Sequence, residues 1–337
     1  MIDAILRYEL IPTLFIRWGI RALLWRRLAE ERARPREAFL EAVRSGPIAL
    51  ATEAANGQHY ELPVALYHHM LGPKLKYSCG LFETGAEDLA AAEEGMLTLT
   101  MERAGLEDGQ RVLELGCGWG SLTLTMAQRF PKSSFTAVSN SRSQKTFIDG
   151  ECARRGLSNV RVITADMNEF SLEETFDRIV SVQMFEHMRN VPELFRRVAR
   201  WLSPQGRLFL EVFTHRDTPY LFEVRDWSDW MTRYFFAGGM MPSDDLYAQF
   251  HDALTVERDW TVNGTHYART ARAWRENLER AQKPVRALFA QIYGAGEVSR
   301  WWAYWRTYLL ACEELWAYRG GDEWHVKHYR FRRSDLA

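Results

Sequence analysis

Short apolar runs alternate with amphipathic stretches through the middle of the chain. The apolar runs predict β-strands at 111–115, Ser134–Val138, Val160–Thr164, Phe176–Ser181 and Leu208–Glu211. The intervening residues have helical spacing, which begins near Ser121 after the first run. Because strands that alternate with helices usually form parallel sheets, the pattern predicts a Rossmann-like α/β fold.

The regions around these strands have different patterns. Residues 1–90 are mainly helical in pattern and predict an N-terminal cap on a domain spanning 91–337. Residues 216–250 are rich in aromatic side chains, and 263–320 predict long helices; both are expected to form a substrate pocket. A sixth strand is expected within 251–262. Alternation over Glu323–Arg330 predicts a last strand.

The N-terminal stretch from Ile5 to Leu28 is apolar but carries interspersed arginines, and Pro12 interrupts it. It contains no run of 18 apolar residues that could span a membrane, and no cleavage signal follows it. We expect it to pack as a helix over the cofactor site, with contact to a lipid surface as the alternative.

Glycines two residues apart follow the first strand, in Leu-Gly-Cys-Gly-Trp-Gly at 115–120. Gly116 and Gly118 lack a Cβ, so the backbone can pass close to a bulky cofactor there. The spacing differs from the G-x-G-x-x-G of dinucleotide sites, and the acid Glu114 suits a cofactor with a cationic amino-acid end better than a diphosphate. The loop therefore predicts a site for S-adenosylmethionine (SAM).

Polar residues after the second and third strands fit the same site, since ligands of open α/β sheets collect at the carboxyl ends of strands. Asn140 and Gln144 are placed to hydrogen-bond a ribose, Asp166 to accept from the adenine amino group, and Met167 to pack on the ring. Taken singly, Asp166 could equally be a helix cap and Asn140 a turn residue.

A carboxylate and an imidazole, Glu186 and His187, follow the fourth strand in Val-Gln-Met-Phe-Glu-His-Met. A Glu-His pair is more often a solvated helix start. Because this strand abuts the reactive end of the cofactor, we interpret the pair instead as a proton acceptor or charge stabiliser beside the sulfonium.

With these motifs in view, the chain resembles the cyclopropane-fatty-acyl-phospholipid synthases and their relatives, the coclaurine-type N-methyltransferases. The resemblance covers nearly the whole length and is closer to the second branch. It rests on Leu-Lys-Tyr-Ser-Cys-Gly at 75–80, the glycine loop, Ser139–Ser141 with Gln144, Phe-Glu-His-Met at 185–188, and later His266-Tyr267, Tyr304-Trp305-Arg306 and Glu323-Trp324. It implies a class I methyltransferase fold with a seven-stranded, mostly parallel sheet, in which the last strand runs antiparallel between the fifth and sixth.

The resemblance also implies roles. Tyr77 and Ser78 would close over the methionine end of SAM, beside Gln183, and Glu186 with His187 would sit at the transfer site. In the lipid cyclopropanases a bicarbonate is held by a cysteine, a glutamate, a histidine and a tyrosine. Cys79, Glu186 and Tyr308 match three of these positions, but the histidine position is assigned to Val212. Bicarbonate is therefore not expected. Since cyclopropanation requires a base, amine methylation is favoured.

Aromatic residues of the insertion and of 301–308 are expected to line the substrate pocket, where ring faces attract a cationic amine by about 0.5–2 kcal/mol each. Ordinary core packing or a lipid groove would also explain such residues. The substrate residues predicted on this basis, with Cys79 from the preceding loop, are Phe185, Tyr220, Phe222, Trp230, Tyr234, Tyr304 and Trp305.

Composition limits the classes of partner. The 43 basic and 44 acidic residues nearly balance, so nothing favours a nucleic-acid partner. Four cysteines without C-x-x-C spacing argue against a zinc site, and we expect no metal and a reducing, cytoplasmic location. The sequence thus predicts a SAM-dependent methyltransferase that yields S-adenosylhomocysteine (SAH) and acts on a small-molecule amine, with lipid cyclopropanation as the alternative. Peripheral membrane contact and a homodimer stay open.

Overall fold

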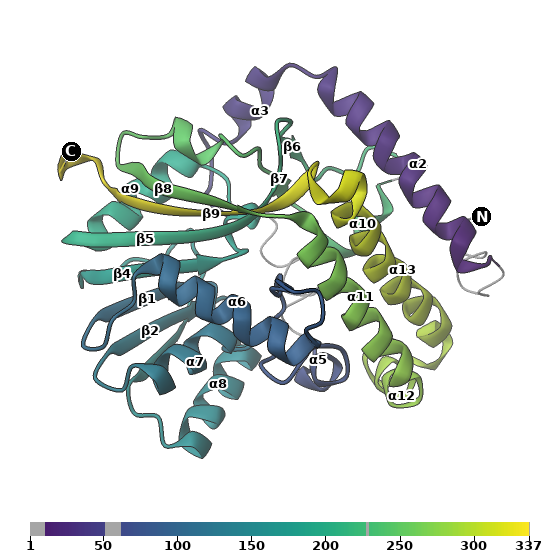
Figure 1. The fold of residues 1–337 in the computed structure, drawn as a ribbon, viewed down its shortest axis with the longest axis horizontal. Helices are drawn as coiled ribbons and strands as arrows, with labels where there is room; N and C mark the ends of the chain where they lie inside the picture. Colours follow the sequence, from purple (N-terminus) through teal and green to yellow (C-terminus); the bar gives the residue numbers. More distant parts are fainter. Residues whose placement is uncertain (1–10, 51–61, 227–228, 337) are drawn as a thin grey trace.

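A computed structural model describes residues 11–50, 62–226 and 229–336. Its centre is a seven-stranded sheet in the order β3-β2-β1-β4-β5-β9-β8 (Figure 1). β9 is antiparallel to both of its neighbours, and the other pairs are parallel, which confirms the predicted topology. The strands are β1 Arg111–Leu115, β2 Ser134–Ser139, β3 Val160–Thr164, β4 Phe176–Val182, β5 Leu202–His215, β8 Leu254–Val262 and β9 Trp324–Arg333.

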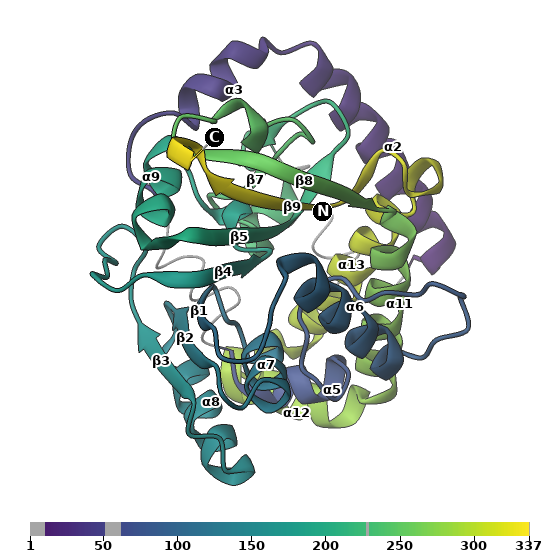
Figure 2. The same cartoon turned by 60° about the vertical axis from the view of Figure 1, so that its left-hand side comes forward.

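Alternating residues of the inner strands bury both faces of the sheet. Val112 and Phe209 pack with α6 (Leu89–Ala104) and α7 (Ser121–Arg129), whereas Leu113 and Leu208 pack with α9 (Val191–Trp201) and α3 (Arg36–Ala42). α8 (Arg142–Arg155) covers β2 and β3. Figure 2 shows α9 and α6 on opposite sides of the sheet. Two buried faces explain why the strands read as continuous apolar runs.

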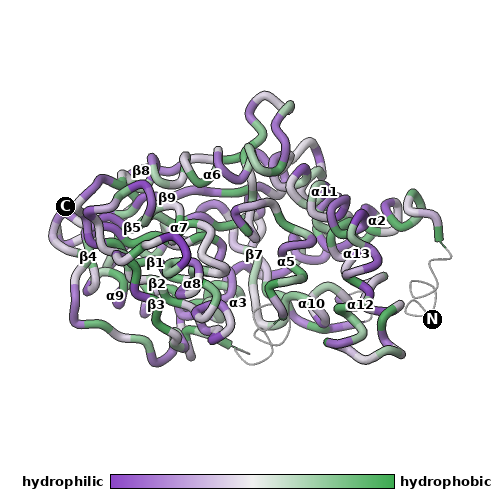
Figure 3. The backbone as a smooth tube through the Cα atoms, turned by 90° about the horizontal axis from the view of Figure 1, so that it is seen from below, coloured by the Kyte–Doolittle hydropathy of each residue, from purple (hydrophilic) through white to green (hydrophobic). Residues whose placement is uncertain are grey.

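A second, aromatic-rich body of core lies beside the sheet, where α11 (Gly264–Arg280), α12 (Gln282–Tyr293) and α13 (Val298–Trp316) pack together with α5 (Val64–Met70). Seen from below, the sheet occupies one end of the molecule and these helices the other (Figure 3). The insertion folds over the junction as β6 Tyr220–Leu221, α10 Trp230–Phe235 and β7 Met240–Met241. Short 3₁₀ turns lie at Phe185–His187, Tyr247–Gln249, Ala295–Glu297, Tyr318–Gly321 and Ser334–Leu336.

The N-terminal helix differs from its prediction. α2 (Thr13–Arg32) begins directly after Pro12, and it packs on α13. No residue of α2 is among the described residues that line the cofactor cavity, so the expectation that this helix covers the site is wrong for its described part. α6 begins at Leu89, so it crosses the boundary expected at residue 90, and the division into cap and domain stays a prediction.

In the part of the chain that the structure describes, none of the helices combines the length and hydropathy needed to cross a membrane.

Candidate active site

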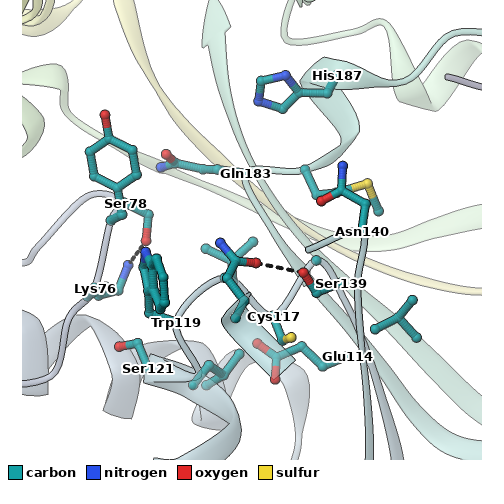
Figure 4. A pocket seen from close by; sticks show the side chains of 18 of the residues that line it. Lys76, Ser78, Glu114, Cys117, Trp119, Ser121, Ser139, Asn140, Gln183 and His187 are labelled. Atoms are coloured by element: carbon teal, nitrogen blue, oxygen red, sulfur yellow. Dashed lines mark hydrogen bonds between the residues drawn. The ribbon is translucent and has the colours of Figure 1, made fainter. Parts of the chain in front are cut away.

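A cavity lies at the carboxyl ends of β1, β2, β3 and β4, bounded by the 75–78 loop, α11 and α13. In Figure 4, Lys76, Ser78 and Trp119 stand on one side of it and Ser139 and Asn140 on the other, with Gln183 between them. All ten residues predicted to hold the cofactor line this cavity, namely Tyr77, Ser78, Glu114, Gly116, Gly118, Asn140, Gln144, Asp166, Met167 and Gln183.

The three glycines of the loop all have positive φ, but they face different neighbours. A Cβ on Gly116 would lie 2.7 Å from the Cβ of Met184, and a Cβ on Gly120 would lie 2.8 Å from Ile148. A Cβ on Gly118 would meet no atom within 4 Å. Gly118 is therefore the glycine whose missing side chain leaves room in the cavity itself.

Glu114 presents a buried carboxyl to the cavity. Burial raises its pKa to about 7, although the hydroxyl of Thr123 donates a hydrogen bond to it and acts in the opposite direction. A cationic group placed beside this carboxyl would favour its ionised form. The chemistry therefore suits the amino-acid end of SAM, as the sequence indicated.

The residues after β2 and β3 are positioned by local hydrogen bonds. Ser141 caps α8 by accepting from the backbone N–H of Gln144 at 3.2 Å, which places Gln144 on the first turn at the cavity. Gln144 Oε1 accepts from Ser139 Oγ at 2.6 Å. Asp166 accepts from the backbone N–H of Asn168 at 2.7 Å while it lines the cavity. It is thus both a turn cap and a candidate contact for the adenine.

Lys76 is a cavity residue that sequence reasoning missed. Its side chain is only 3% exposed. Its Nζ donates to Ser78 Oγ and, at 2.8 Å, to the carbonyl of Cys79, so it holds the loop in shape. The available signal was its place in the sequence, directly before the predicted cofactor residues Tyr77 and Ser78. Other lining residues that were not predicted include the aromatic side chains of Tyr67, Trp119, Phe213, Phe236, Tyr267 and Trp274.

The 3₁₀ turn Phe185–His187 places the side chains of Glu186 and His187 in different surroundings. His187 lines the cavity and stacks on Phe236 at 5.7 Å. Glu186 is fully buried and is not among the described lining residues; its Oε1 accepts from the backbone N–H of Phe213 at 2.7 Å. Burial raises the pKa of Glu186 to about 8. The predicted pair therefore does not share one position at the cavity, and a catalytic role for Glu186 stays a prediction.

Tyr308, the third predicted catalytic residue, lines the cavity. Its ring stacks on Phe235 at 4.3 Å, and the hydroxyl of Tyr77 lies 3.4 Å from its own. Burial raises the pKa of Tyr308 well above its usual value, so the phenol stays neutral. Tyr77 and Tyr308 thus form one wall beside His187.

None of the eight predicted substrate residues is among the described residues that line the cavity, and their contact with substrate stays a prediction. Phe222 packs on Phe236, and Trp305 packs on Phe235. Their physical role here is to support the first aromatic layer, which is the core-packing alternative noted above. Phe185 packs instead on Phe195 and Tyr247, in the core beside α9. Cys79 is buried, Tyr220 accepts from the indole of Trp324, and Trp230, Tyr234 and Tyr304 form a cluster.

On β5 the residue facing the site is Glu211, not Val212. Val212 is buried in the cluster with α9, whereas Glu211 accepts a hydrogen bond from Gln183 at 3.2 Å. Strand alternation explains this, because Phe213, two residues on, lines the cavity. Glu211 thus faces the site one residue before the position assigned to the histidine, and that assignment stays a prediction. The residue that faces the site from this strand is still not a histidine.

In the part of the chain that is described, no three side chains of His, Cys, Asp or Glu gather closely enough to hold a metal ion.

Comparisons with known proteins show the family to which the chain belongs. The profile of the mycolic acid cyclopropane synthetase family matches residues 50–325. An (S)-coclaurine N-methyltransferase of Thalictrum flavum subsp. glaucum is 37% identical, covering 98% of this chain and 94% of the relative. The cyclopropane-fatty-acyl-phospholipid synthase of Escherichia coli K12 is 31% identical over 80% of this chain and 66% of its own.

Among solved structures, coclaurine N-methyltransferase bound to N-methylheliamine and SAH superposes with a TM-score of 0.93 at 35% identity, with 98% of each chain covered. The mycobacterial cyclopropane synthase MmaA2, at 23% identity and a TM-score of 0.70, shares the fold and covers 84% of this chain. The chain therefore belongs to the mycolic acid cyclopropane synthetase family and is a SAM-dependent methyltransferase.

Proposed function

We propose that this protein transfers a methyl group from SAM to the nitrogen of a small-molecule amine. The observation that carries the proposal is the similarity, over the full length of both chains, to an enzyme solved with an N-methylated amine and SAH. The N-methyltransferase of Thalictrum flavum subsp. glaucum supports it at the level of sequence.

The cavity residues fit the cofactor. Glu114, Lys76 and Ser78 offer charged and polar groups for its amino-acid end, Asn140 and Gln144 for its ribose, and Asp166 with Met167 for its adenine. When bound, SAM supplies an electrophilic methyl group on a sulfonium.

Catalysis is then mainly a matter of holding the amine. The aromatic rings of Phe213, Phe236 and Tyr308 supply faces for a cationic or apolar substrate. Holding a nucleophile at the point of transfer can contribute up to about 7–11 kcal/mol. His187, at the cavity, is the residue we assign to take or orient the proton of the amine. Glu186 holds the Phe213 backbone in place from behind.

Cyclopropane formation on lipid acyl chains is the second candidate, since Cys79, Glu186 and Tyr308 match the bicarbonate positions and a lipid synthase is 31% identical. Two observations count against it. The residue that faces the site from β5 is Glu211 rather than a histidine, and neither Cys79 nor Glu186 is among the described lining residues. A carboxylate facing the site is a poor neighbour for an anionic bicarbonate.

The test is a methyl-transfer assay with labelled SAM, a panel of primary and secondary amines, and vesicles of unsaturated phospholipid. We expect label in an amine product at a rate that does not change when carbonate is rigorously removed. Label in the lipid fraction, with a severalfold loss on carbonate removal that is restored by adding it back, would establish the second candidate instead.

The cytoplasmic location, the homodimer and the peripheral contact with a membrane stay predictions. A homodimer contact or a membrane contact would form on the outer face of α2, because large apolar side chains are exposed there. Each of Leu14, Phe15, Trp18 and Trp25 is at least 60% exposed.

A further inference from the structure

A chain of hydrogen bonds leads from the cavity wall into the sheet. The hydroxyl of Tyr267 donates to Gln183 Oε1 at 2.7 Å, and Gln183 Nε2 donates to Glu211 Oε1 at 3.2 Å. Tyr267 and Gln183 line the cavity, whereas Glu211 is fully buried behind them. Figure 4 shows the Gln183 side chain extending into the cavity between Ser78 and His187.

Glu211 also fixes the backbone of Gln183. Gln183 has φ +50°, a region that non-glycine residues rarely occupy. Its N–H donates to the carbonyl of Glu211 at 2.8 Å, so the same residue holds both its main chain and its side chain. Strain of this kind persists where surrounding bonds determine the conformation and is concentrated at functional sites.

The groups around Glu211 keep its carboxylate ionised. Lys76 Nζ lies 3.9 Å from Oε1, and His328 Nε2 lies 3.2 Å from Oε2 across the β5–β9 register. Arg103 Nη1 is 2.8 Å from His328 Nδ1, which makes Nδ1 the acceptor and Nε2 the nitrogen that carries hydrogen. Burial opposes ionisation, but these neighbours and Gln183 lower the pKa of Glu211 below its usual value.

The negative charge on Glu211 determines the direction of the hydrogen bonds that join Glu211, Gln183 and Tyr267. An ionised carboxylate can only accept, so the Gln183 amide must turn its nitrogen toward Glu211 and its oxygen toward Tyr267. The hydroxyl of Tyr267 then donates its hydrogen to Gln183 Oε1. Burial raises the pKa of Tyr267 well above its usual value, so the phenol stays protonated. Its oxygen and that of Gln183 are left as acceptors at the cavity.

We propose that Glu211 is a positioning residue that sets this direction, so that the cavity wall accepts hydrogen bonds from the N–H groups of a bound ammonium. The inference rests on the proposed function and names its substrate class: amines whose cation carries N–H, in preference to quaternary ammonium compounds. A wall of donors would repel such a cation, whereas acceptors stabilise it, and hydrogen bonds to a charged group are stronger than those between neutral groups.

The test measures binding rather than turnover. In the presence of SAH, calorimetry at pH 7 compares N,N-dimethylbenzylammonium, which carries one N–H, with N,N,N-trimethylbenzylammonium, which carries none. We expect the wild type to bind the first about 10-fold more tightly, the equivalent of about 1.4 kcal/mol. In Glu211→Gln the ratio should fall to about 2-fold or less, because an amide at this position can donate as well as accept. Tyr267→Phe should reduce it to a smaller extent, because this variant removes one of the two acceptors and leaves Gln183 Oε1 at the cavity.

Glu313→Gln is the matched control. Glu313 is a buried carboxylate on α13 that is paired with Arg17, Arg272 and Arg275, and it is not among the described lining residues. Its variant should keep the ratio of the wild type. SAH affinity should stay within about threefold in Glu211→Gln, because the carboxylate acts through Gln183 and is itself buried behind the cavity wall.

An unchanged ratio in Glu211→Gln with SAH binding intact, or no preference in the wild type, would overturn the inference. If Glu211→Gln does not fold, Tyr267→Phe decides by the same ratio. Failure of the proposed function has a different signature: the preference for the N–H cation would be present, yet the labelled methyl group would appear in no amine.

Discussion

At the scale of single residues, the glycines of the 115–120 loop serve different purposes. Gly116 and Gly120 are required by protein neighbours, whereas the space beside Gly118 belongs to the cavity. The same substitution should therefore have different consequences at neighbouring positions.

Gly118→Ala should fold with a small loss of stability, of about 1 kcal/mol for a positive φ, but should weaken SAH binding at least about 10-fold. Gly120→Ala should lose more stability, because its Cβ would also press on Ile148. Calorimetry with SAH and thermal denaturation of both variants check this. Unchanged SAH affinity in Gly118→Ala would remove the assignment of this glycine to the cofactor.

The buried carboxyl of Glu186 makes stability depend on pH. The pKa of Glu186 is about 8 in the folded protein and has its ordinary value in the unfolded chain. At a pH between these two values, the carboxyl is protonated in the folded protein and ionised in the unfolded chain. The contribution of this protonated carboxyl to the free energy of unfolding is fully present below the pKa of the unfolded chain. It is lost as the pH rises to about 8, by up to about 1.4 kcal/mol per pH unit.

Glu186→Gln should therefore gain stability relative to the wild type as pH rises from 5 to 8 in urea denaturation. Glu313→Gln provides the opposite control. Hydrogen bonds from Arg17 and Arg272 lower the pKa of Glu313 against the effect of burial, so this variant should lose relative stability as pH rises from below the lowered pKa of Glu313 to its unfolded value. Parallel pH profiles for the two variants would contradict both assignments.

The cofactor half of the site could be predicted from sequence because its residues follow strands directly, where chain order fixes position. Gln183 and Asp166 are examples. The substrate half could not. Tyr234 and Phe236 are two residues apart on the insertion, yet only Phe236 reaches the cavity, because the packing of α10 on α13 decides which ring faces inward.

At the scale of elements, α2 is attached by ion pairs as well as by the apolar contacts of Leu24 and Leu28. Arg17 pairs with Glu313 and Glu314, Arg21 with Glu314, and Arg27 with Asp229, and the acidic partners are at most 3% exposed at their side chains. Buried carboxylates without these arginines would be left uncompensated.

Arg17→Met should therefore destabilise the protein by about 1–3 kcal/mol, a range reduced from that of fully buried pairs because Arg17 is 23% exposed. Arg26→Met removes an exposed pair with Glu30 and should cost less than about 1 kcal/mol. Urea denaturation measures both, and proteolysis in the connection at 33–35 should accelerate only in Arg17→Met. Equal effects would mean that α2 is held by its apolar contacts instead.

Elements were predictable where apolar periodicity is strong. β1, β3 and β9 appear where expected, whereas β5 extends from Leu202 to His215, well beyond the apolar run. Its first residues, Ser-Pro-Gln-Gly, carry turn signals, and a bulge accommodates them between Phe176 and Arg178 of β4. The two-residue strands β6 and β7 have no period that a sequence could show.

At the scale of the whole molecule, the outward face of α2 carries large exposed apolar side chains. Trp18 and Trp25 are 66% exposed and lie seven residues apart, on one side of the helix. The arginines that border them, Arg21 and Arg26, are already paired with acidic groups, so neither supplies the free positive charge that favours anionic lipid. We therefore predict that a second copy of the chain covers this face.

Sedimentation should accordingly show a dimer for the wild type at micromolar concentration and a monomer for Trp18→Glu combined with Trp25→Glu. The double variant should keep SAH affinity, since neither residue is among those described as lining the cavity. A monomeric wild type that pellets with phospholipid vesicles, and a variant that does not, would assign this face to lipid.

The position of β9 has a consequence for synthesis on the ribosome. This strand follows the other six along the chain, yet it fills the gap between β5 and β8 and brings His328 against Glu211. Until it emerges from the exit tunnel, β5 and β8 expose open edges, which invite pairing with other chains. Until then, Glu211 also lacks its neighbour His328, and this carboxylate is the one proposed to orient Gln183 at the cavity wall. Nascent chains that stall before residue 324 should therefore depend on chaperones, and the methyl-transfer end of the cavity is completed only by the last strand to arrive.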